Sequence, residues 1–247
     1  MKKTIGLLLG AIVVVLALAV MILNKETGAL LKVKKLETAP TIDASWDKAP
    51  WQGIQPELIG NFMGEKPQHL PKTEVKIAYD DTALYLIFRV EDQYVRAVAA
   101  DHQRGVYRDS CVEFFFTTGT DVAQGYFNLE MNCGGRMLFS FQRAPEEGQV
   151  SIPKAEIGKI EIAHSLPQII DPEIEEPTTW TVEYRLPLSV LDSYCPVAKP
   201  APGVTWRANF QKCADAVSHP HWLTWAVIDS PRPNFHLPQF FGTLEFE

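Results

Sequence analysis

The pattern of hydrophobic and polar positions predicts strands over most of the chain. Polar and apolar residues alternate at positions 73–79, and an apolar run at 83–90 follows the turn signal Asp80-Asp81, so the two segments predict a hairpin. Further strands are predicted at 110–117, 126–132, 137–142, 179–186, 205–213, 222–228 and 242–246. No convincing helical period appears after residue 35, apart from a turn at 188–194. Many short strands separated by Pro-, Gly- and Asp-rich loops predict an all-β protein, an antiparallel β-sandwich of jelly-roll type.

Residues 143–178 are the least regular part of the body. Five prolines interrupt this segment, and we expect a long insertion that contains a strand at 158–163. No internal repeat is present, so residues 38–247 are interpreted as one domain.

The N-terminus has a different pattern. Residues 4–23 hold seventeen apolar residues out of twenty, after the basic start Met1-Lys2-Lys3. A helix of about twenty residues is long enough to cross a bilayer. We therefore expect one hydrophobic helix in residues 1–24, either an uncleaved anchor or a cleaved signal peptide, and then a linker at 25–37. On either reading the body is exported to the periplasm or cell surface, and an uncleaved segment would hold it at the cytoplasmic membrane.

Charge argues against nucleic acid as a partner. The chain of 247 residues has a formal net charge of -7, but residues 1–35 hold six lysines and one glutamate. The body therefore carries about -12 and would repel a phosphate backbone.

Five short motifs in order along the body resemble a known family. Residues 41–51 resemble an I-D-G-x-x-D-x-x-W opening, and the hairpin at 75–92 resembles V-x-x-x-W-D-x-x-x-L-Y-x-x-x-x-V-x-D. Residues 107–115 resemble W-x-x-D-S-V-E-x-F, and residues 126–132 and 238–244 complete the set. Together they resemble the family 9 carbohydrate-binding modules over about residues 38–247.

The resemblance implies a sandwich that binds oligo- or polysaccharide through two aromatic side chains that clamp a terminal sugar. The clamp positions, tryptophan in the family, fall on Tyr107 and Phe235. Smaller rings offer less area for the apolar face of a pyranose. Glu113, Asn132 and Gln211 match polar residues of the family's site, whereas Glu130 stands where the family has an arginine. No cofactor is required; a structural calcium ion is implied by the family, and the sequence identifies no metal ligands.

These site residues also have structural interpretations. Tyr107 and Phe235 could be rim aromatics without a ligand, and the two glutamates could pair with Arg89 or Arg136. The six tryptophans are expected to be mostly core residues.

The leading function is non-catalytic carbohydrate binding that supports polysaccharide breakdown by other enzymes. A glycoside hydrolase acting through Glu113 and Glu130 is an alternative if their strands are neighbours. A haem-binding electron-transfer subunit of the same superfamily fold is another, with Met131, Met137 and Lys212 as candidate ligands. A scaffold that has lost ligand binding is the fourth.

Four cysteines in an exported protein raise the question of disulfides. Residues two apart on a strand share a face, so Cys111 should share a face with Glu113, and Cys213 with Gln211. A Cys111–Cys213 disulfide is therefore expected if both faces line one site, and two buried free thiols are the alternative.

Overall fold

The computed structural model describes residues 28–143 and 148–247. Its strands are β1 (Leu30–Lys35), β2 (Glu57–Ile59), β3 (Asn61–Phe62), β4 (Lys72–Tyr79), β5 (Ala83–Asp92), β6 (Val95–Ala97), β7 (Cys111–Phe116), β8 (Tyr126–Asn132), β9 (Met137–Gln142), β10 (Val150–Ser151), β11 (Glu161–His164), β12 (Ile170–Ile174), β13 (Thr178–Pro187), β14 (Thr205–Ala214), β15 (His221–Thr224) and β16 (Gly242–Phe246). The helical elements are single turns: α2 (Ala49–Gln52), α3 (Lys154–Ile157), η1 (Val106–Arg108), η2 (Val122–Gln124), η3 (Leu188–Val190) and η4 (Pro238–Phe240).

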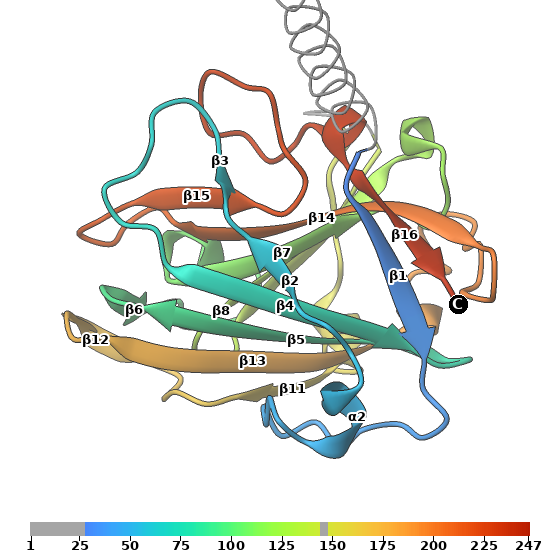
Figure 1. The fold of residues 1–247 in the computed structure, drawn as a ribbon, viewed down its shortest axis with the longest axis horizontal. Coiled ribbons are helices and arrows are strands. Elements are labelled where there is room, and N and C mark those ends of the chain that lie inside the picture. The colour runs from blue at the N-terminus through green and yellow to red at the C-terminus, as the bar shows by residue number, and fades with distance from the viewer. Residues whose placement is uncertain (1–27, 144–147) are drawn as a thin grey trace, which may run out of the picture.

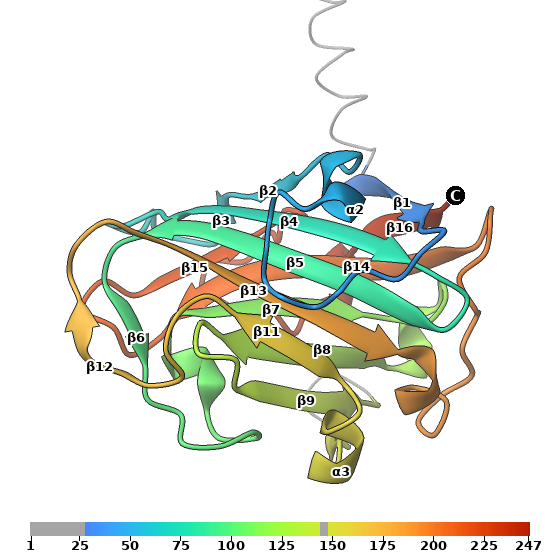
Figure 2. The same ribbon diagram turned by 90° about the horizontal axis from the view of Figure 1, so that it is seen from below.

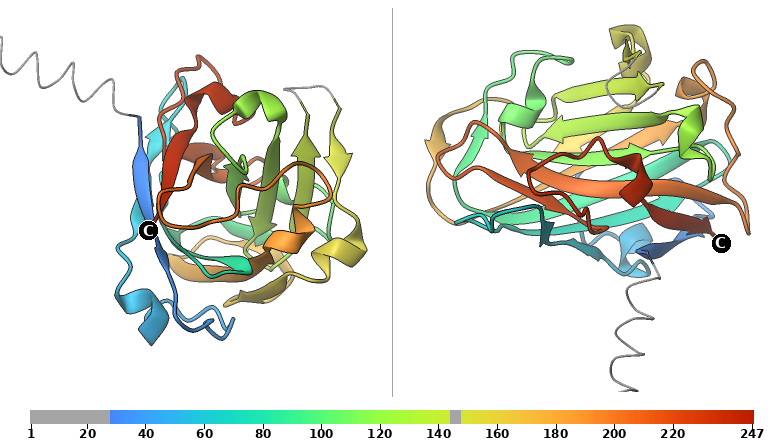
Figure 3. Two further views of the ribbon diagram at one scale, coloured as in Figure 1. Left: turned by 90° about the vertical axis from the view of Figure 1, so that its right-hand side faces the viewer. Right: turned by 90° about the horizontal axis from the view of Figure 1, so that it is seen from above.

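The strands form one curled sheet that folds back on itself into two layers (Figures 1 and 2). The first layer runs in the order β10-β9-β8-β7-β14-β16, with β15 and β3 extending from β14. The second layer runs β4-β5-β13-β11, with β2 against β4. The curl is seen end-on in the left view of Figure 3. The predicted all-β, sandwich-like fold is confirmed for the described residues, and the N-terminal hydrophobic helix expected in residues 1–24 lies outside them.

Strand β1 corrects the prediction in two ways. Part of the segment assigned to a linker is this strand, with Leu31 and Val33 buried between exposed lysines. Its first half pairs with β16 and its second half with β4, so β1 joins the two layers. Both pairings are parallel, so the sheet is mixed rather than purely antiparallel. Figure 1 shows β1 alongside β16.

The other predicted strands match the structure closely. β4 and β5 form the expected hairpin in continuous antiparallel register. β8, β9 and β16 have the predicted bounds, β7 and β13 differ by one residue at each end, and β14 is one residue longer at its C-terminal end. β15 ends four residues early, and of the strand expected at 158–163 only the second half is strand, in β11, because residues 158–160 form a turn after α3. The strands that the pattern missed are short or, like β1 and β12, lie in segments interpreted as irregular.

Both faces of the central strands are covered, which explains their nearly continuous apolar runs. The main core lies between the layers and includes Phe88, Phe114 and Trp180. A second cluster covers the outer face of β5 with Trp46 and Trp51 from the N-terminal segment. A third cluster lies on the outer face of the first layer. Its members are Met63, Ala99, Val106, Cys111, Phe115, Tyr126, Cys213, Ile228, Phe235 and Phe241.

A buried carboxylate explains the motif at residues 41–51. Glu183 on β13 has a fully buried side chain. Its Oε2 accepts hydrogen bonds from the backbone N–H groups of Asp43 and Ala44, and its Oε1 accepts one from Trp51 Nε1 at 2.8 Å. Lys48 Nζ lies 2.7 Å from Oε2 and supplies the opposite charge. The segment therefore wraps around one carboxylate, which fixes it over the outer face of β5.

A second buried charge lies between the layers. Lys212 on β14 is fully buried, and its Nζ donates to His221 Nε2 at 2.7 Å and lies 3.6 Å from Asp92 Oδ2. Asp92, at the end of β5, also bonds His69 Nε2 at 2.7 Å. Burial raises the pKa of Asp92, but the Lys212 charge and the His69 hydrogen bond outweigh it and lower this pKa to about 2. Asp92 therefore stays ionised, and its contact with Lys212 connects the two layers.

In the part of the chain that the structure describes, none of the helices has the length and apolar character needed to cross a bilayer.

We predict that Ala44→Gly stabilises the protein. Ala44 has a φ of 61°, in the left-handed region, at the position where the motif of the resemblance has glycine. A side chain there strains the backbone, and relieving the strain should outweigh the greater unfolded-state entropy of glycine, for a net gain of about 0.5–1 kcal/mol. Urea unfolding measures the change. A stability equal to or below that of the parent chain would show that the surrounding hydrogen bonds hold Ala44 without strain.

Candidate functional site

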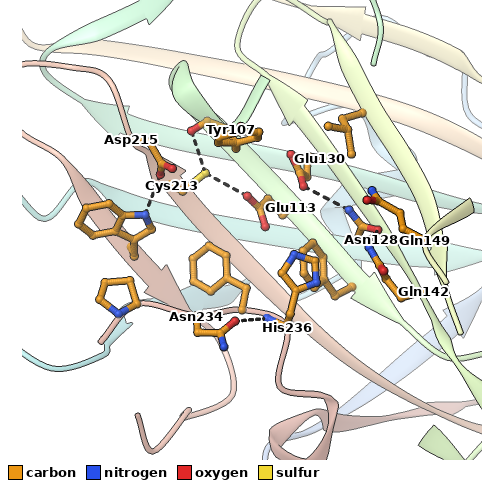
Figure 4. A pocket seen from close by; sticks show the side chains of 15 residues that line it. Tyr107, Glu113, Asn128, Glu130, Gln142, Gln149, Cys213, Asp215, Asn234 and His236 are labelled. Atoms are coloured by element: carbon orange, nitrogen blue, oxygen red, sulfur yellow. Dashed lines mark hydrogen bonds between the residues drawn. The ribbon is translucent and has the colours of Figure 1, made fainter. Parts of the chain in front are cut away.

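A cavity of about 360 Å³ opens on the outer face of the first layer, the face that points away from the main core (Figure 4). Strands β7, β8 and β9 form its floor, η1 and the end of β14 one side, and the loop before η4 the other. Its lining residues are Tyr107, Glu113, Phe115, Asn128, Glu130, Leu138, Gln142, Gln149, Cys213, Asp215, Trp222, Pro233, Asn234, Phe235 and His236. The cavity thus combines aromatic rings with carboxyl and amide groups.

Two carboxyl groups lie side by side on the floor. Glu113 and Glu130 are direct partners in the antiparallel register of β7 and β8, so their side chains point to the same face. Both are buried, with 3% and 6% of their surface exposed. Glu113 Oε1 accepts a hydrogen bond from the Cys213 thiol at 3.0 Å, and Glu130 Oε1 accepts one from Asn128 Nδ2 at 3.2 Å. Among the described residues, neither Oε2 atom has a hydrogen-bond partner.

Burial determines the protonation of this pair. Loss of hydration raises the pKa of Glu130 to about 8, against an ordinary value of 4.5. Burial raises the pKa of Glu113 well above its ordinary value, and the neighbouring acidic groups Cys213 and Glu130 oppose its ionisation further. Burial also raises the pKa of Asp215, although the Trp222 indole N–H donates to Asp215 Oδ1 at 2.7 Å. Burial therefore favours the protonated forms of Glu113 and Glu130, which can donate as well as accept hydrogen bonds.

Tyr107 is held at the cavity mouth by the backbone around it. Its carbonyl accepts a hydrogen bond from the Asp215 N–H at 3.1 Å, which ties η1 to the end of β14. Two residues later, the buried Asp109 carboxylate accepts from the Ala99 N–H and from Asn132 Nδ2. Tyr107 is 41% exposed, so its side chain is accessible to a ligand in the cavity.

The structure brings four of the six predicted ligand-binding residues to this one cavity: Tyr107, Glu113, Glu130 and Phe235. Neither glutamate pairs with an arginine in the described residues. Phe235 is 8% exposed and lies edge-on to Phe115, so it forms part of the wall rather than an open platform. That these residues contact a sugar stays a prediction.

Asn132 and Gln211 do not line the cavity. Asn132 is fully buried and uses its amide to hold Asp109 and the Arg136 N–H, which positions the η1 segment. Gln211 lies opposite Glu113 in the register of β14 and β7 and is also fully buried. Within residues 28–143 and 148–247, neither atom of the Gln211 amide has a hydrogen-bond partner. Their buried positions place both behind the lining rather than in it.

The expected Cys111–Cys213 disulfide is not formed in this structure, although the two cysteines share a face as predicted. Cys111 and Cys213 are direct partners in the register of β7 and β14, on the same face as Glu113 and Gln211. Both are nevertheless free thiols. Burial raises the pKa of Cys111 to about 12, and that of Cys213 is also raised by burial. The thiols therefore act as small buried donors beneath the cavity.

The same thiols belong to a set of potential metal ligands. The ligand atoms of Cys111, Glu113 and Cys213 all lie within 4.8 Å of one another. Such a set suits a thiophilic ion such as zinc, after loss of the thiol protons. Calcium takes oxygen ligands, so this group does not supply the structural calcium site implied by the resemblance, which stays a prediction.

The structure does not favour the haem alternative. Met131 and Met137 face each other within the main core, and both are fully buried. Lys212 is fully buried and bonded to His221. The three side chains thus lie in packed interior and not around an open cleft.

Several lining residues were missed from the sequence, above all Trp222 and Asp215. Trp222 lies opposite Cys213 in the register of β14 and β15, and its half-buried ring therefore shares the face of the cavity. It was counted with the core tryptophans; the other five are buried. The sequence feature that could have placed Trp222 at the cavity is the β14–β15 hairpin, because its register sets Trp222 opposite Cys213. Asn234 and His236 come from a loop whose course no local pattern indicates.

Comparison with known proteins agrees with this geometry. The family model of carbohydrate-binding family 9 matches residues 45–246. A protein of Bacteroides uniformis ATCC 8492, proposed to bind carbohydrate, is 30% identical with a TM-score of 0.80, and the match covers 90% of this chain and 100% of that one. A search of curated proteins found no match.

Two structures of a family 9 module from Caldicellulosiruptor kristjanssonii share the fold. The complex with cellotriose has a TM-score of 0.60 at 17% identity, and the match covers 89% of this chain and 94% of that one. The complex with glucose has a TM-score of 0.57 at 20% identity, with 89% and 96% covered. Since the family model spans most of the chain, the protein belongs to carbohydrate-binding family 9.

Proposed function

We propose that this protein binds the end of an oligo- or polysaccharide in the cavity on the outer face of the first layer. The observation that carries the proposal is the combination, in one cavity, of two accessible aromatic rings, Tyr107 and Trp222, with the carboxyl pair Glu113 and Glu130. Family membership and the cellotriose and glucose complexes of the Caldicellulosiruptor module support carbohydrate as the ligand class.

The chemistry of the cavity suits a pyranose. The ring presents an apolar C–H face, which packs on an aromatic side chain, and a rim of hydroxyl groups that need partners. Tyr107 and Trp222 offer the aromatic surface, while Asn128, Glu113 and Glu130 offer donors and acceptors. A protonated carboxyl group matches a hydroxyl well, because both can donate and accept.

Export and a role in polysaccharide breakdown by other enzymes belong to the proposal. The apolar segment at residues 4–23, after a basic start, supports export to the periplasm or cell surface and attachment to the membrane if it is retained. A binding module in that compartment would hold polysaccharide fragments near the enzymes that cleave them.

Binding without catalysis is favoured over hydrolysis. Glu113 and Glu130 are on neighbouring strands, as the hydrolase alternative requires. Hydrolysis needs one carboxylate ionised at working pH, however, whereas burial raises the pKa of both groups here. Family 9 is also a family of binding modules.

We predict that Tyr107→Ala and Trp222→Ala each weaken sugar binding. Each change removes an aromatic face from the cavity, at an expected cost of about 1 kcal/mol, or about fivefold in Kd. A glycan array with the full chain identifies the ligand, and calorimetry with that ligand measures the variants.

The control is Phe62→Ala, because Phe62 is 40% exposed but does not line the cavity. Equal affinities for all four proteins would remove the rings from the binding site. Failure to bind any glycan on the array would refute the proposal itself, and release of reducing sugar from the same glycans would favour the hydrolase.

We predict that Glu130→Gln reduces the pH dependence of stability. The pKa of Glu130 is about 8 in the folded chain, above its ordinary value of 4.5, so the folded state keeps a proton that the unfolded state has lost. The free energy of unfolding therefore falls as the pH rises from about 4.5 to about 8. Glutamine cannot ionise, so the variant should be more stable than the parent chain at pH 8, by on the order of a few kcal/mol.

Urea unfolding at pH 5 and pH 8 tests this, with the exposed Glu37→Gln as control. Parallel pH profiles for the parent chain and Glu130→Gln would show that Glu130 ionises normally in the fold.

A further inference from the structure

The cavity has an excess of acidic groups without a matching cation. Glu113, Glu130 and Asp215 all line it, and its described lining contains no lysine or arginine. His236 is the basic side chain present, and its Nδ1 is bonded to the Tyr126 hydroxyl at 2.8 Å. The positive charge of Arg108 acts on Asp215 from outside the lining.

Two of these groups each hold one oxygen atom without a hydrogen-bond partner in a buried position. Glu113 and Glu130 are more than nine-tenths buried, yet the Oε2 atom of each lacks a partner among the described residues. Buried polar atoms are normally hydrogen-bonded, and an unmet one costs about 1–3 kcal/mol. Figure 4 shows the two carboxyl groups beside each other on the cavity floor. A ligand that brings donors to both would recover this energy.

The ligand's charge follows from the same geometry. A hydroxyl group has a single proton to donate, whereas an ammonium group has three and carries the opposite charge. Bonds from a charged donor to a carboxylate are about twice as strong as those between neutral groups. An ammonium group between Glu113 and Glu130 would favour their ionised forms, so the protons that burial keeps on the two carboxyl groups would pass to solvent and both Oε2 atoms would accept from the ligand. The sugar ring would remain within reach of Tyr107 and Trp222.

We propose that the cavity is selective for an amino sugar, a pyranose with a free primary ammonium group that lies between Glu113 and Glu130. This inference rests on the proposed function, because it names the sugar class for the same cavity. Glucosamine and its short β-linked oligomers are the simplest ligands of that class.

The test compares three sugars of matched size on the full chain, slightly below pH 7. Glucosamine carries the ammonium group, glucose replaces it with a hydroxyl, and N-acetylglucosamine keeps the nitrogen without the charge. Calorimetry should show glucosamine binding about tenfold or more tighter than both neutral sugars. Glu113→Gln and Glu130→Gln should each abolish most of that preference, whereas the exposed Glu37→Gln should leave it intact.

The outcomes separate the two proposals. Glucose binding as tightly as glucosamine would overturn the amino-sugar inference and leave carbohydrate binding in place. Failure of all three sugars, of their oligomers and of every glycan on the array would overturn carbohydrate binding as well. If a glutamine variant does not fold, the comparison of the three sugars on the parent chain decides the matter alone.

Discussion

The buried ion pair of Lys212 and Asp92 connects the two layers, and the position of the cavity depends on it. An ammonium group inside the core is tolerated only if it is paired and hydrogen-bonded, and here Asp92, His221 and the Cys213 carbonyl provide that. Burial and the nearby Lys212 charge lower the pKa of His221 to about 3. The imidazole therefore stays neutral, and its Nε2 can accept a hydrogen bond from the Lys212 ammonium group. The pair holds β14 of the first layer against the end of β5 in the second.

That pairing also fixes which face of β14 carries the cavity. Because side chains alternate along a strand, Lys212 in the core requires Gln211 and Cys213 on the opposite face. Through the cross-strand register, the face of Cys213 is also that of Glu113 and Trp222. One charged residue in the interior therefore helps to set the position of a thiol, a carboxyl group and an aromatic ring in the cavity. A shift of β14 by one residue would move Lys212 from the core to the outer face, and it would also turn Cys213 away from the cavity.

Much of this could be predicted from the sequence, for reasons that differ between fold and site. Alternation and turn residues located the long strands, since both faces of β5 and β7 are covered and their apolar runs are clear. β1 was misassigned because Leu31, Val33 and the lysines around them were interpreted as part of a linker after the hydrophobic segment. Their alternation with those two residues is itself a strand signal, but parallel pairing to β16 and β4 depends on distant parts of the chain.

The cavity residues that were predicted lie where a family motif coincides with a strand, as at Glu113 and Glu130. The cavity residues that were missed are placed by contacts between segments distant in the sequence. The aromatic side chains illustrate the difference. The motif led to Tyr107 and Phe235, but Phe235 is packed edge-on against Phe115, and the second accessible ring comes from Trp222 on another strand. A chain that lacks tryptophan at both motif positions therefore still presents one at its cavity. Its indole N–H donates to Asp215, so the ring that could cover a sugar is oriented by an acidic group of the same cavity.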